Sequence, residues 1–331
     1  MAKSVKENAV DQATYLTSDN VVEFDVKSVL LEALEVFRSN QLLAQGEYEQ
    51  KLDLIENPEK RQDLLAEPET PEELAAIAKE QGPVIVSVKN FTKKYPKTDR
   101  PAVDDLSFEI REGQFHAFIG ANGAGKTTTM KALVGAYARP KWKGQITIGG
   151  YDNQDARAKA KIGYVPEKAV FPNNFTTKQY LENTARLSGL SNQKAKEFCA
   201  KTLADFKMEK LANKRPEKFS SGQKKKILCA QALCHNPDVL ILDEPAANLD
   251  PIARFELFEM LKQIQAQGKS IFISSHILAE VGQYANYATI LDGGKIVYSG
   301  PLTKRTNLEK LYRKYVLVGS VHTANDPVNE N

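Results

Sequence analysis

The segment Gly120–Thr128 reads GANGAGKTT and fits the pattern G-x-x-x-x-G-K-[ST] of a phosphate-binding loop. An apolar and aromatic run with strand character, Gln114–Ile119, comes directly before it. Apolar residues recur at helical spacing over Thr127–Tyr137, directly after it. The loop is therefore predicted to join a strand to the first turn of a helix. Free N–H groups and the positive end of the helix dipole suit that position to a triphosphate.

Each residue type in this loop has a predicted task. The glycines let the backbone wrap around phosphates without a Cβ in the way. Lys126 is predicted to bridge the β- and γ-phosphates, Thr127 to ligate Mg²⁺ through its hydroxyl, and Thr128 to support the α-phosphate through its backbone N–H. The predicted nucleotide-binding residues of the loop are Gly120, Ala121, Asn122, Gly123, Ala124, Gly125, Lys126, Thr127 and Thr128.

Charge divides the chain into two regions. Residues 1–82 hold 8 basic and 18 acidic residues, a net charge of −10, whereas residues 83–331 carry about +13. We predict an acidic N-terminal extension over 1–82, partly helical, a domain over 83–316, and a tail over 317–331. A basic body suits nucleic acid, but it equally suits an ATP-binding protein beside anionic lipid.

The acidic extension holds no chemical motif. Val29–Gln45 has the apolar spacing of an amphipathic helix, and Pro71–Lys79 is predicted to form a short second helix. Two interpretations stay open: a solvated, partly disordered extension, or a docking and regulatory element. The opposite charges of the extension and the body suggest that the extension folds back on the domain or on a partner.

Three cysteines do not form a disulfide framework, so we expect a reducing compartment. Cys229, Cys234 and His235 could be metal ligands, but their apolar helical surroundings, Ile227–Leu233, favour burial. No apolar run approaches the ~18–20 residues of a membrane span, and the N-terminus has no signal-peptide pattern. We expect a soluble intracellular protein whose membrane role, if any, belongs to a partner.

A second chemical motif closes a predicted buried strand. The run DVLILDEP, Asp238–Pro245, is apolar and ends in Asp243 and Glu244 at the edge where open α/β sheets bind ligands. We predict that Asp243 holds Mg²⁺ through water and that Glu244 faces an attacking water; a solvated acidic turn is the alternative. The strand Ser270–Ser275 leads to His276, which we predict to contact phosphate.

The rest of the pattern alternates strands and helices. Tyr95, about 25 residues before the loop, is predicted to stack on adenine or to be a surface turn residue. Phe219–Gln223 precedes a helix and resembles an anion-binding N-terminus. The further predicted elements are strands Val84–Val88, Val103–Ile110, Gln145–Ile148 and Ile162–Val165, a helical block Phe175–Lys214, helices Lys226–Leu233, Ile252–Gln265 and Leu308–Val316, and a hairpin of Ala288–Leu291 with Lys295–Tyr298.

Together these motifs resemble the nucleotide-binding domain of ABC transporters over Pro83–Val316, about three quarters of the chain. Gly120–Thr128 resembles the family's Walker A, Asp238–Glu244 its Walker B with the catalytic glutamate, and Phe219–Gln223 its signature. In the same order, Ala246–Asp250 resembles the D-loop. His276 resembles the switch histidine, and Tyr95 the aromatic residue of the A-loop.

The resemblance implies further site residues and also shows departures. Ser220, Gly222, Gln223 and Asp250 are implied to contact nucleotide, and Glu167 stands at the Q-loop position, where it could reach Mg²⁺ or the lytic water. The family has glutamine where this chain has Glu167. It usually has glycine at position 221, where this chain has serine, and the D-loop reads Ala-Ala-Asn before Leu249.

The implied fold is α/β: a P-loop ATPase core with a parallel sheet, a small antiparallel β subdomain, and an inserted helical subdomain over about 172–222. The implied function is ATP hydrolysis with Mg²⁺, catalysed by Lys126, Glu244 and His276 and coupled to transport. The partners are a second nucleotide-binding domain, in a homodimer or with a homologue, and integral membrane subunits. The expected location is the inner face of the cell membrane.

Two other classes compete with this interpretation. An ABC-type ATPase acting on ribosomes or DNA would resemble tandem domains or carry long insertions, which this chain lacks, so no nucleic acid is expected. A GTPase would need an Asn-Lys-x-Asp motif, and the chain has none. The pattern Tyr-Val-Pro-Glu followed by Phe171-Pro172 is closest to the exporter branch with separate membrane subunits, while the transported substrate stays open.

Overall fold

The computed structural model divides the chain into two compact units, Met1–Pro68 and Glu69–Asn331. The structure describes residues 12–17 and 20–25, positions 31, 35, 38, 49, 52 and 56, and residues 82–318 except 140, 304 and 305. The predicted domain boundary at Gly82 stays a prediction, because residues 57–81 lie outside the described part. The predicted helix Pro71–Lys79 and the tail beyond residue 318 lie outside it as well.

The first unit contains a hairpin that was not predicted. Strands β1 (Gln12–Thr17) and β2 (Asn20–Asp25) pair antiparallel, with Gln12 opposite Asp25. The predicted helix over Val29–Gln45 falls largely outside the described residues, although Leu31, Glu35 and Arg38 within it are helical.

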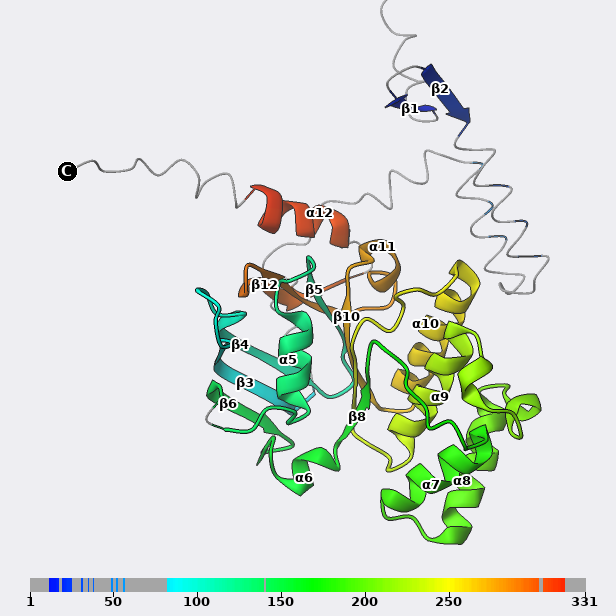
Figure 1. The fold of residues 1–331 in the computed structure, drawn as a ribbon. Coiled ribbons are helices and arrows are strands. Elements are labelled where there is room, and N and C mark those ends of the chain that lie inside the picture. The colour runs from blue at the N-terminus through cyan, green and yellow to red at the C-terminus, as the bar shows by residue number, and fades with distance from the viewer. Residues whose placement is uncertain are drawn as a thin grey trace, which may run out of the picture. The chain divides into compact units, whose positions relative to one another are not determined.

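A six-stranded sheet forms the centre of the second unit, in the order β12-β11-β5-β10-β9-β8 (Figure 1). Neighbouring strands from β11 to β8 run parallel, and β12 closes the edge antiparallel to β11, which confirms the predicted hairpin. The bounds are β5 Phe115–Gly120, β8 Ile162–Val165, β9 Val239–Leu242, β10 Ser270–Ser275, β11 Tyr287–Asp292 and β12 Lys295–Pro301.

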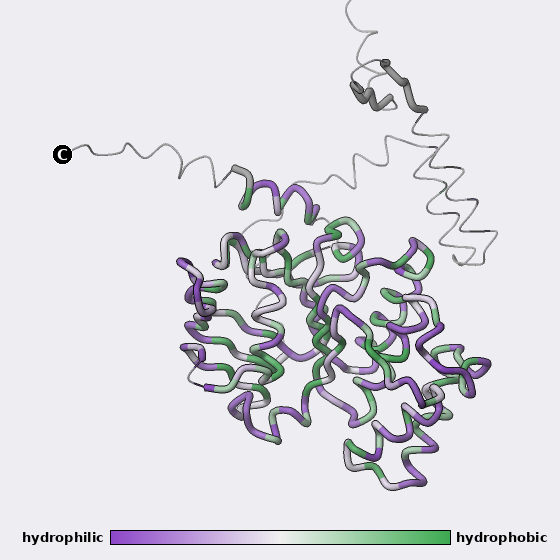
Figure 2. The backbone as a smooth tube through the Cα atoms, in the orientation of Figure 1, coloured by the Kyte–Doolittle hydropathy of each residue, from purple (hydrophilic) through white to green (hydrophobic). Residues whose placement is uncertain are grey.

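The central strands of the sheet are buried on both faces, and β9 is apolar along its whole length. Side chains alternate between faces along a strand. In β5, Phe115, Ala117 and Ile119 pack in a cluster with the helices, whereas Phe118 packs in a cluster with the smaller sheet. In Figure 2 the tube is largely green, and so hydrophobic, through the middle of the domain. Burial on both faces is the reason that the motif strands read as continuous apolar runs.

The smaller sheet is antiparallel, with the order β4-β3-β6-β7. Its strands are β3 (Val84–Lys93), β4 (Val103–Arg111), β6 (Lys143–Ile148) and β7 (Tyr151–Asp152), and only β7 was not predicted. Helix α5 (Lys126–Leu133) lies between the two sheets in Figure 1 and ends before the predicted Tyr137.

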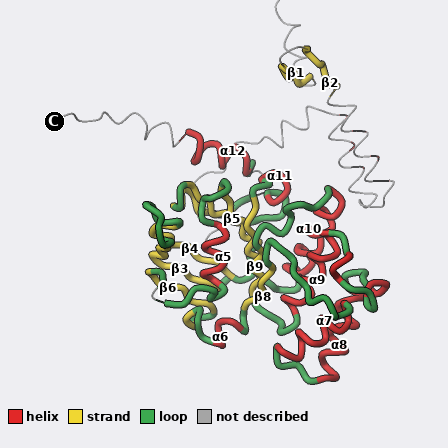
Figure 3. Tube along the Cα trace, in the orientation of Figure 1, coloured by secondary structure: helices red, strands yellow, loops and turns green. Residues whose placement is uncertain are grey.

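A helical subdomain follows β8 in the chain and lies apart from the smaller sheet in Figure 3, where helices are red. It contains α7 (Thr177–Leu187), α8 (Asn192–Asp205), the 3₁₀ helices η1 (Glu209–Leu211) and η2 (Pro216–Lys218), and α9 (Ser221–Leu233). The predicted start of α9 at Lys226 is wrong by one and a half turns. Ser220 caps the helix and moves its start to Ser221.

The remaining helices are α6 (Ala156–Lys159), α10 (Pro251–Ala266), α11 (Leu278–Val281), α12 (Leu308–Tyr312) and the π-helix η3 (Arg313–Val318). The predicted C-terminal helix is therefore present, but its second half has π geometry. No helix in the described residues is both long enough and apolar enough to span a membrane.

Candidate functional site

The predicted phosphate-binding residues lie at the carboxyl ends of β5, β9 and β10, which are neighbours in the sheet. This edge is where open α/β sheets bind ligands. A cavity of about 380 Å³ opens there. It is lined by Ala102, Asn122, Gly123, Gly125, Lys126, Thr127, Thr128, Glu167, Glu244, Ala247, Asn248 and His276. We call it the nucleotide pocket.

Glycine is required at the end of the loop. Gly125 is the N-cap of α5 and has a φ of 106°, which side chains rarely adopt. A Cβ at Gly125 would lie 2.4 Å from Cγ1 of Val103, in the smaller sheet. The loop can therefore pack closely against β4, and α5 can begin directly at Lys126 with its N–H groups facing the pocket.

Lys126 is nearly buried and holds the loop together from within. Its side chain is 6% exposed, and Nζ donates to the carbonyl oxygens of Gly120 and Ala121 at 2.7 and 3.2 Å. The same ammonium lies 3.2 Å from Oε1 of Glu244. The lysine of the loop and the glutamate after β9 therefore neutralise each other in this structure.

Asp243 is the most buried carboxylate of the pocket region, 1% exposed. Its Oδ1 accepts hydrogen bonds from the hydroxyls of Ser274 at 3.0 Å and Thr127 at 3.2 Å. Burial raises the pKa of Asp243, and the like charges of Glu244 and Glu167 add to the rise, against the effect of the two hydroxyls. The ionised carboxylate is thus short of positive charge.

Glu244 has a strained backbone that several bonds hold in place. Its φ is 42°, uncommon for a residue other than glycine. Its N–H donates to Oγ of Ser274 at 2.8 Å, and Oε2 lies 2.8 Å from Nδ1 of His276. Ser274 was not predicted as a site residue, although it stands in the Ser-Ser-His run at the end of β10. That run was a signal for its role.

The oxygens around Asp243 fit Mg²⁺. The Thr127 hydroxyl and the Asp243 carboxylate are hard ligands held side by side, and Glu167 lines the same pocket. Mg²⁺ in such sites takes one or two carboxylates and completes its shell with water and phosphate oxygens. The described residues contain no group of three His, Cys, Asp or Glu that could hold a metal ion.

The cysteines are buried in the core of the domain. Burial raises the pKa of Cys229 to about 12, and Sγ of Cys234 lies 3.1 Å from Oγ of Ser188. Nε2 of His235 contacts the carbonyl oxygen of Ile162 at 2.8 Å. Cys229 and Cys234 are buried, as their apolar surroundings predicted, and His235 is half-buried.

Tyr95 lies beside the loop rather than in the pocket lining. Its hydroxyl is 3.2 Å from Oγ1 of Thr128 and 2.7 Å from the hydroxyl of Tyr137, and the two rings meet edge to face. Tyr95 is thus placed next to the phosphate-binding loop, and adenine stacking stays a prediction. Tyr137 was not predicted, because a single tyrosine after a helix has no motif around it.

Ser220, Gly222, Gln223 and Asp250 lie in a second cavity of about 280 Å³, which we call the signature pocket. Oγ of Ser220 accepts from the Gln223 N–H, while the Gln223 side chain accepts from the Ser220 N–H. Asp250 caps α10 through the Ala253 N–H at 2.9 Å. A Cβ on Gly222 would lie 2.9 Å from Cβ of Ala253, so this glycine lets α9 approach α10.

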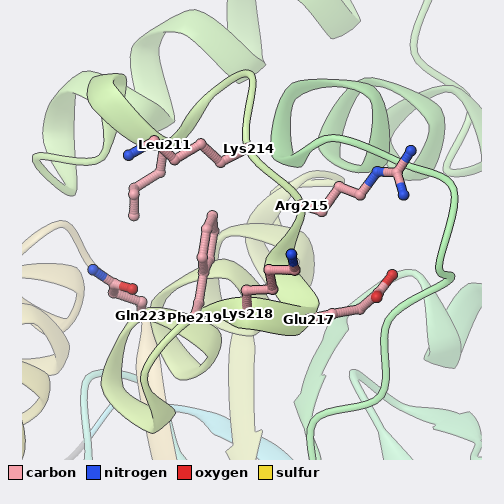
Figure 4. A pocket seen from close by; sticks show the side chains of 7 residues that line it. All are labelled: Leu211, Lys214, Arg215, Glu217, Lys218, Phe219 and Gln223. Carbon is pink, nitrogen blue, oxygen red and sulfur yellow. The ribbon is translucent and has the colours of Figure 1, made fainter.

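A larger hollow of about 580 Å³ lies on the helical subdomain and shares Leu211 and Gln223 with the signature pocket. In Figure 4 the Phe219 ring stands between the segment carrying Leu211 and the turn carrying Lys218, and Arg215 extends to one side. The lining of this hollow includes none of the loop residues or acidic residues that line the nucleotide pocket. Chemistry rather than size therefore identifies the candidate site.

The predicted residues thus fall into two groups. The nucleotide pocket brings together the loop, Glu167, Glu244 and His276, with Asp243 directly behind. The signature pocket is separate from it, and the two share no lining residue. Within one chain, the structure therefore does not bring Ser220 and Asp250 to the loop.

Known proteins include relatives of this chain. Residues 103–247 match the model of the family described as ABC transporter. A putative ABC transporter ATP-binding protein of Mycoplasma pneumoniae is 44% identical over 228 residues, 68% of each chain. A Nod factor export ATP-binding protein I of Burkholderia orbicola is 34% identical, over 65% of this chain and 70% of that protein.

Solved structures show the same fold. The ATP-binding subunit of an ABC transporter aligns with a TM-score of 0.60 and 31% identity, over 70% of this chain and 99% of that one. A dimeric ATP-binding cassette in a post-hydrolysis state with ADP and Pi aligns with a TM-score of 0.59 and 23% identity, over 66% and 99%. The α/β fold predicted from the sequence, with its two sheets and helices, is confirmed.

Proposed function

This chain belongs to the ABC transporter family of ATP-binding proteins, and from that premise we propose how its residues bind and hydrolyse ATP. The family membership makes the chain an ATPase subunit of a transporter. It does not favour the class of ATPases that act on ribosomes or DNA. The proposed roles rest on one observation. Four side chains meet at one edge of the sheet: Lys126, Asp243, Glu244 and His276.

ATP binding is an exchange of partners for Lys126. The triphosphate takes the place of the Glu244 carboxylate beside Nζ, and backbone N–H groups from Gly123 to Thr128 surround the phosphates. Tyr95 stacks on adenine. The exchange releases Glu244, which His276 still contacts on its other oxygen. The carboxylate then becomes available to a water molecule.

Hydrolysis is an in-line attack of water on the γ-phosphoryl group. The bond from the water oxygen to Pγ forms, and the bond from Pγ to the bridging oxygen of ADP breaks. Glu244 orients the water and His276 steadies the γ-phosphate. Lys126 stabilises the charge on the equatorial oxygens. Thr127, Asp243 and Glu167 would hold Mg²⁺, which supplies further charge neutralisation when bound.

The complete site needs a second subunit. In the described residues, the nucleotide pocket and the signature pocket share no lining residue. In a head-to-tail dimer, Ser220 of the partner subunit would approach the γ-phosphate, together with its Gly222 and Gln223, while Asp250 borders the same interface. The partner is either another copy of this chain or a homologue.

Membrane subunits complete the proposed transporter. In this proposal the chain drives integral membrane partners and works at the inner face of the cell membrane. Relatives named for Nod factor export and linearmycin resistance support the exporter branch.

The test of this proposal separates binding from chemistry. Glu244→Gln should retain ATP binding and accumulate as an ATP-bound dimer, while turnover falls by about 10²–10³, the usual cost of one such electrostatic contact. Lys126→Ala should lose ATP affinity as well. Nucleotide binding, sedimentation and phosphate release measure the three quantities. Normal turnover in Glu244→Gln would remove this residue from catalysis.

A further inference from the structure

Lys225 is a buried lysine on α9, two residues beyond Gln223, and it is 4% exposed. Nζ donates to the backbone carbonyl oxygens of Pro166 at 2.8 Å and Glu167 at 2.6 Å. Burial lowers the pKa of this ammonium. A buried charge is costly unless its N–H groups are satisfied, so these two carbonyls hold the side chain firmly. One residue therefore fastens α9 to the loop after β8.

That loop borders the nucleotide pocket. Pro166 and Glu167 follow β8 directly, and Glu167 lines the pocket together with Lys126 and Glu244. Lys225 contacts the backbone carbonyl oxygen of Glu167, so the Glu167 carboxylate takes no part in this hydrogen bond. A shift of Lys225 along or across the helix axis would therefore move the backbone that carries Glu167 and change where its carboxylate lies.

The start of α9, one turn before Lys225, borders the signature pocket. Ser220 and Gln223 satisfy each other's N–H groups at the helix start, and Gly222 packs against Ala253 of α10. At a rise of about 1.5 Å per residue, Lys225 lies only ~7–8 Å along the axis from Ser220. The first turns of α9 are thus a short, capped and rigid connection between Ser220 and Lys225.

We propose that Lys225 is a positioning residue that couples the two nucleotide sites of the dimer, an inference that rests on the head-to-tail arrangement proposed above. When Ser220 engages the nucleotide of the partner subunit, α9 adjusts its position. Lys225 transmits that adjustment to Glu167 in the chain's own pocket. Each site then reaches its active arrangement only when the other is filled.

A purely structural lysine would hold the same contacts, so the test needs matched variants. Lys225→Met keeps length and loses every donor. Lys225→Gln loses the charge but keeps N–H donors for the carbonyls. Lys224→Met removes a charge from the adjacent, half-buried position of the same helix and is the control. If hydrogen-bond donation to the loop is what matters, Gln should substitute for Lys225 and Met should not.

The experiment uses the full chain in the Glu244→Gln background, with ATP added to drive dimer formation. Sedimentation follows the dimer, and hydrogen exchange follows the backbone amides of residues 167–170. In the parent, Lys224→Met and Lys225→Gln, protection of this loop should rise as the dimer forms. In Lys225→Met the dimer should form, but the gain in protection should be at least about fivefold smaller, the lower end of typical coupling.

Turnover gives a second readout in the chain with Glu244 intact. Hydrolysis should depend on ATP concentration with a Hill coefficient above one, and Lys225→Met alone should bring it close to one. If Lys225→Met does not fold, Lys225→Ala, which leaves room for water at both carbonyls, is read in the same way. A parent that forms no ATP-dependent dimer overturns the proposed function and this inference with it. A normal dimer with equal loop protection in Lys225→Met overturns the inference alone.

Discussion

The nucleotide pocket and the signature pocket are built on different principles. In the first, ionisable side chains contact one another: Lys126 lies beside Glu244, Glu244 lies beside His276, and Asp243 accepts hydrogen bonds from two hydroxyl groups. In the second, Ser220 and Gln223 satisfy the start of a helix, and a glycine allows close packing. The signature pocket is also lined by charged residues, with Lys226 and Glu256 paired at 2.8 Å, but only the nucleotide pocket places its charged side chains beside a phosphate-binding loop.

The largest expected effect tests this division directly. Ser220→Arg should leave ATP affinity of the monomer intact, because Ser220 lines only the signature pocket of its own chain. It should abolish ATP-dependent dimer formation and lower turnover by more than about 10²-fold, because the arginine would occupy the γ-phosphate position of the partner subunit's site. Nucleotide titration and sedimentation measure the two effects.

Gln193→Arg, on the exposed surface of α8, adds the same charge far from either pocket and is the control for Ser220→Arg. If monomer affinity falls as far as turnover in Ser220→Arg, the two pockets are not divided between subunits. The comparison would then be broken, and the head-to-tail arrangement with it.

A moderate effect concerns the cost of the buried carboxylate. The pKa of Asp243 is raised in the folded chain, so its ionised form is penalised by folding. Asp243→Asn should therefore raise the melting temperature of the nucleotide-free chain by a few degrees near neutral pH. The gain should shrink as pH falls through the raised pKa and vanish below the ordinary aspartate range. Turnover should drop, because the Mg²⁺ ligand is lost.

Scanning calorimetry across pH checks this prediction, with Asp99→Asn in an exposed turn as the control. An Asp243→Asn chain that melts lower than the parent at neutral pH would show that this pocket is stabilised by its own charges. The difference between the two pockets would then not lie in the cost of burying the Asp243 charge.

The smallest effect concerns residues 1–82. Both pockets consist of residues from Ala102 onwards, so removal of 1–82 should leave ATP affinity within about twofold of the full chain, less than one ordinary hydrogen bond contributes. Turnover of the assembled transporter should change, and the difference should shrink but persist at high salt, because surface charge contacts are screened and an apolar stripe is not. Identical turnover at every salt concentration would mark the segment as a passive extension.

Local patterns explain most of what the sequence predicted correctly. A glycine-rich loop dictates its own backbone, and a strand buried on both faces must be apolar, so Gly120–Thr128 and Asp243 could be placed on the right elements from these patterns alone. The division into two sheets was implied by the resemblance to the ABC family and not by any local pattern. Element ends were less predictable, because the start of α9 depends on which serine caps it.

The features that the sequence analysis did not predict depend on tertiary neighbours. Lys225 stands in a run of three lysines, and its proposed role follows from carbonyl groups about sixty positions away in the chain. One signal was available: Lys225 precedes the buried Cys229 by one helical turn and so shares its face. The two-residue strand β7 is too short for periodicity to reveal.

The hydroxyl of Ser274 donates one hydrogen bond and accepts another, to Asp243 and from the backbone of Glu244, in a position with no exposed surface. Over evolutionary descent, such a position has almost no freedom to drift. Alanine gives neither bond, and any larger side chain must fit additional atoms into a fully buried position. Among lineages that keep hydrolysis, codons at position 274 should stay within serine's own set, even where the neighbouring surface residues have been replaced many times.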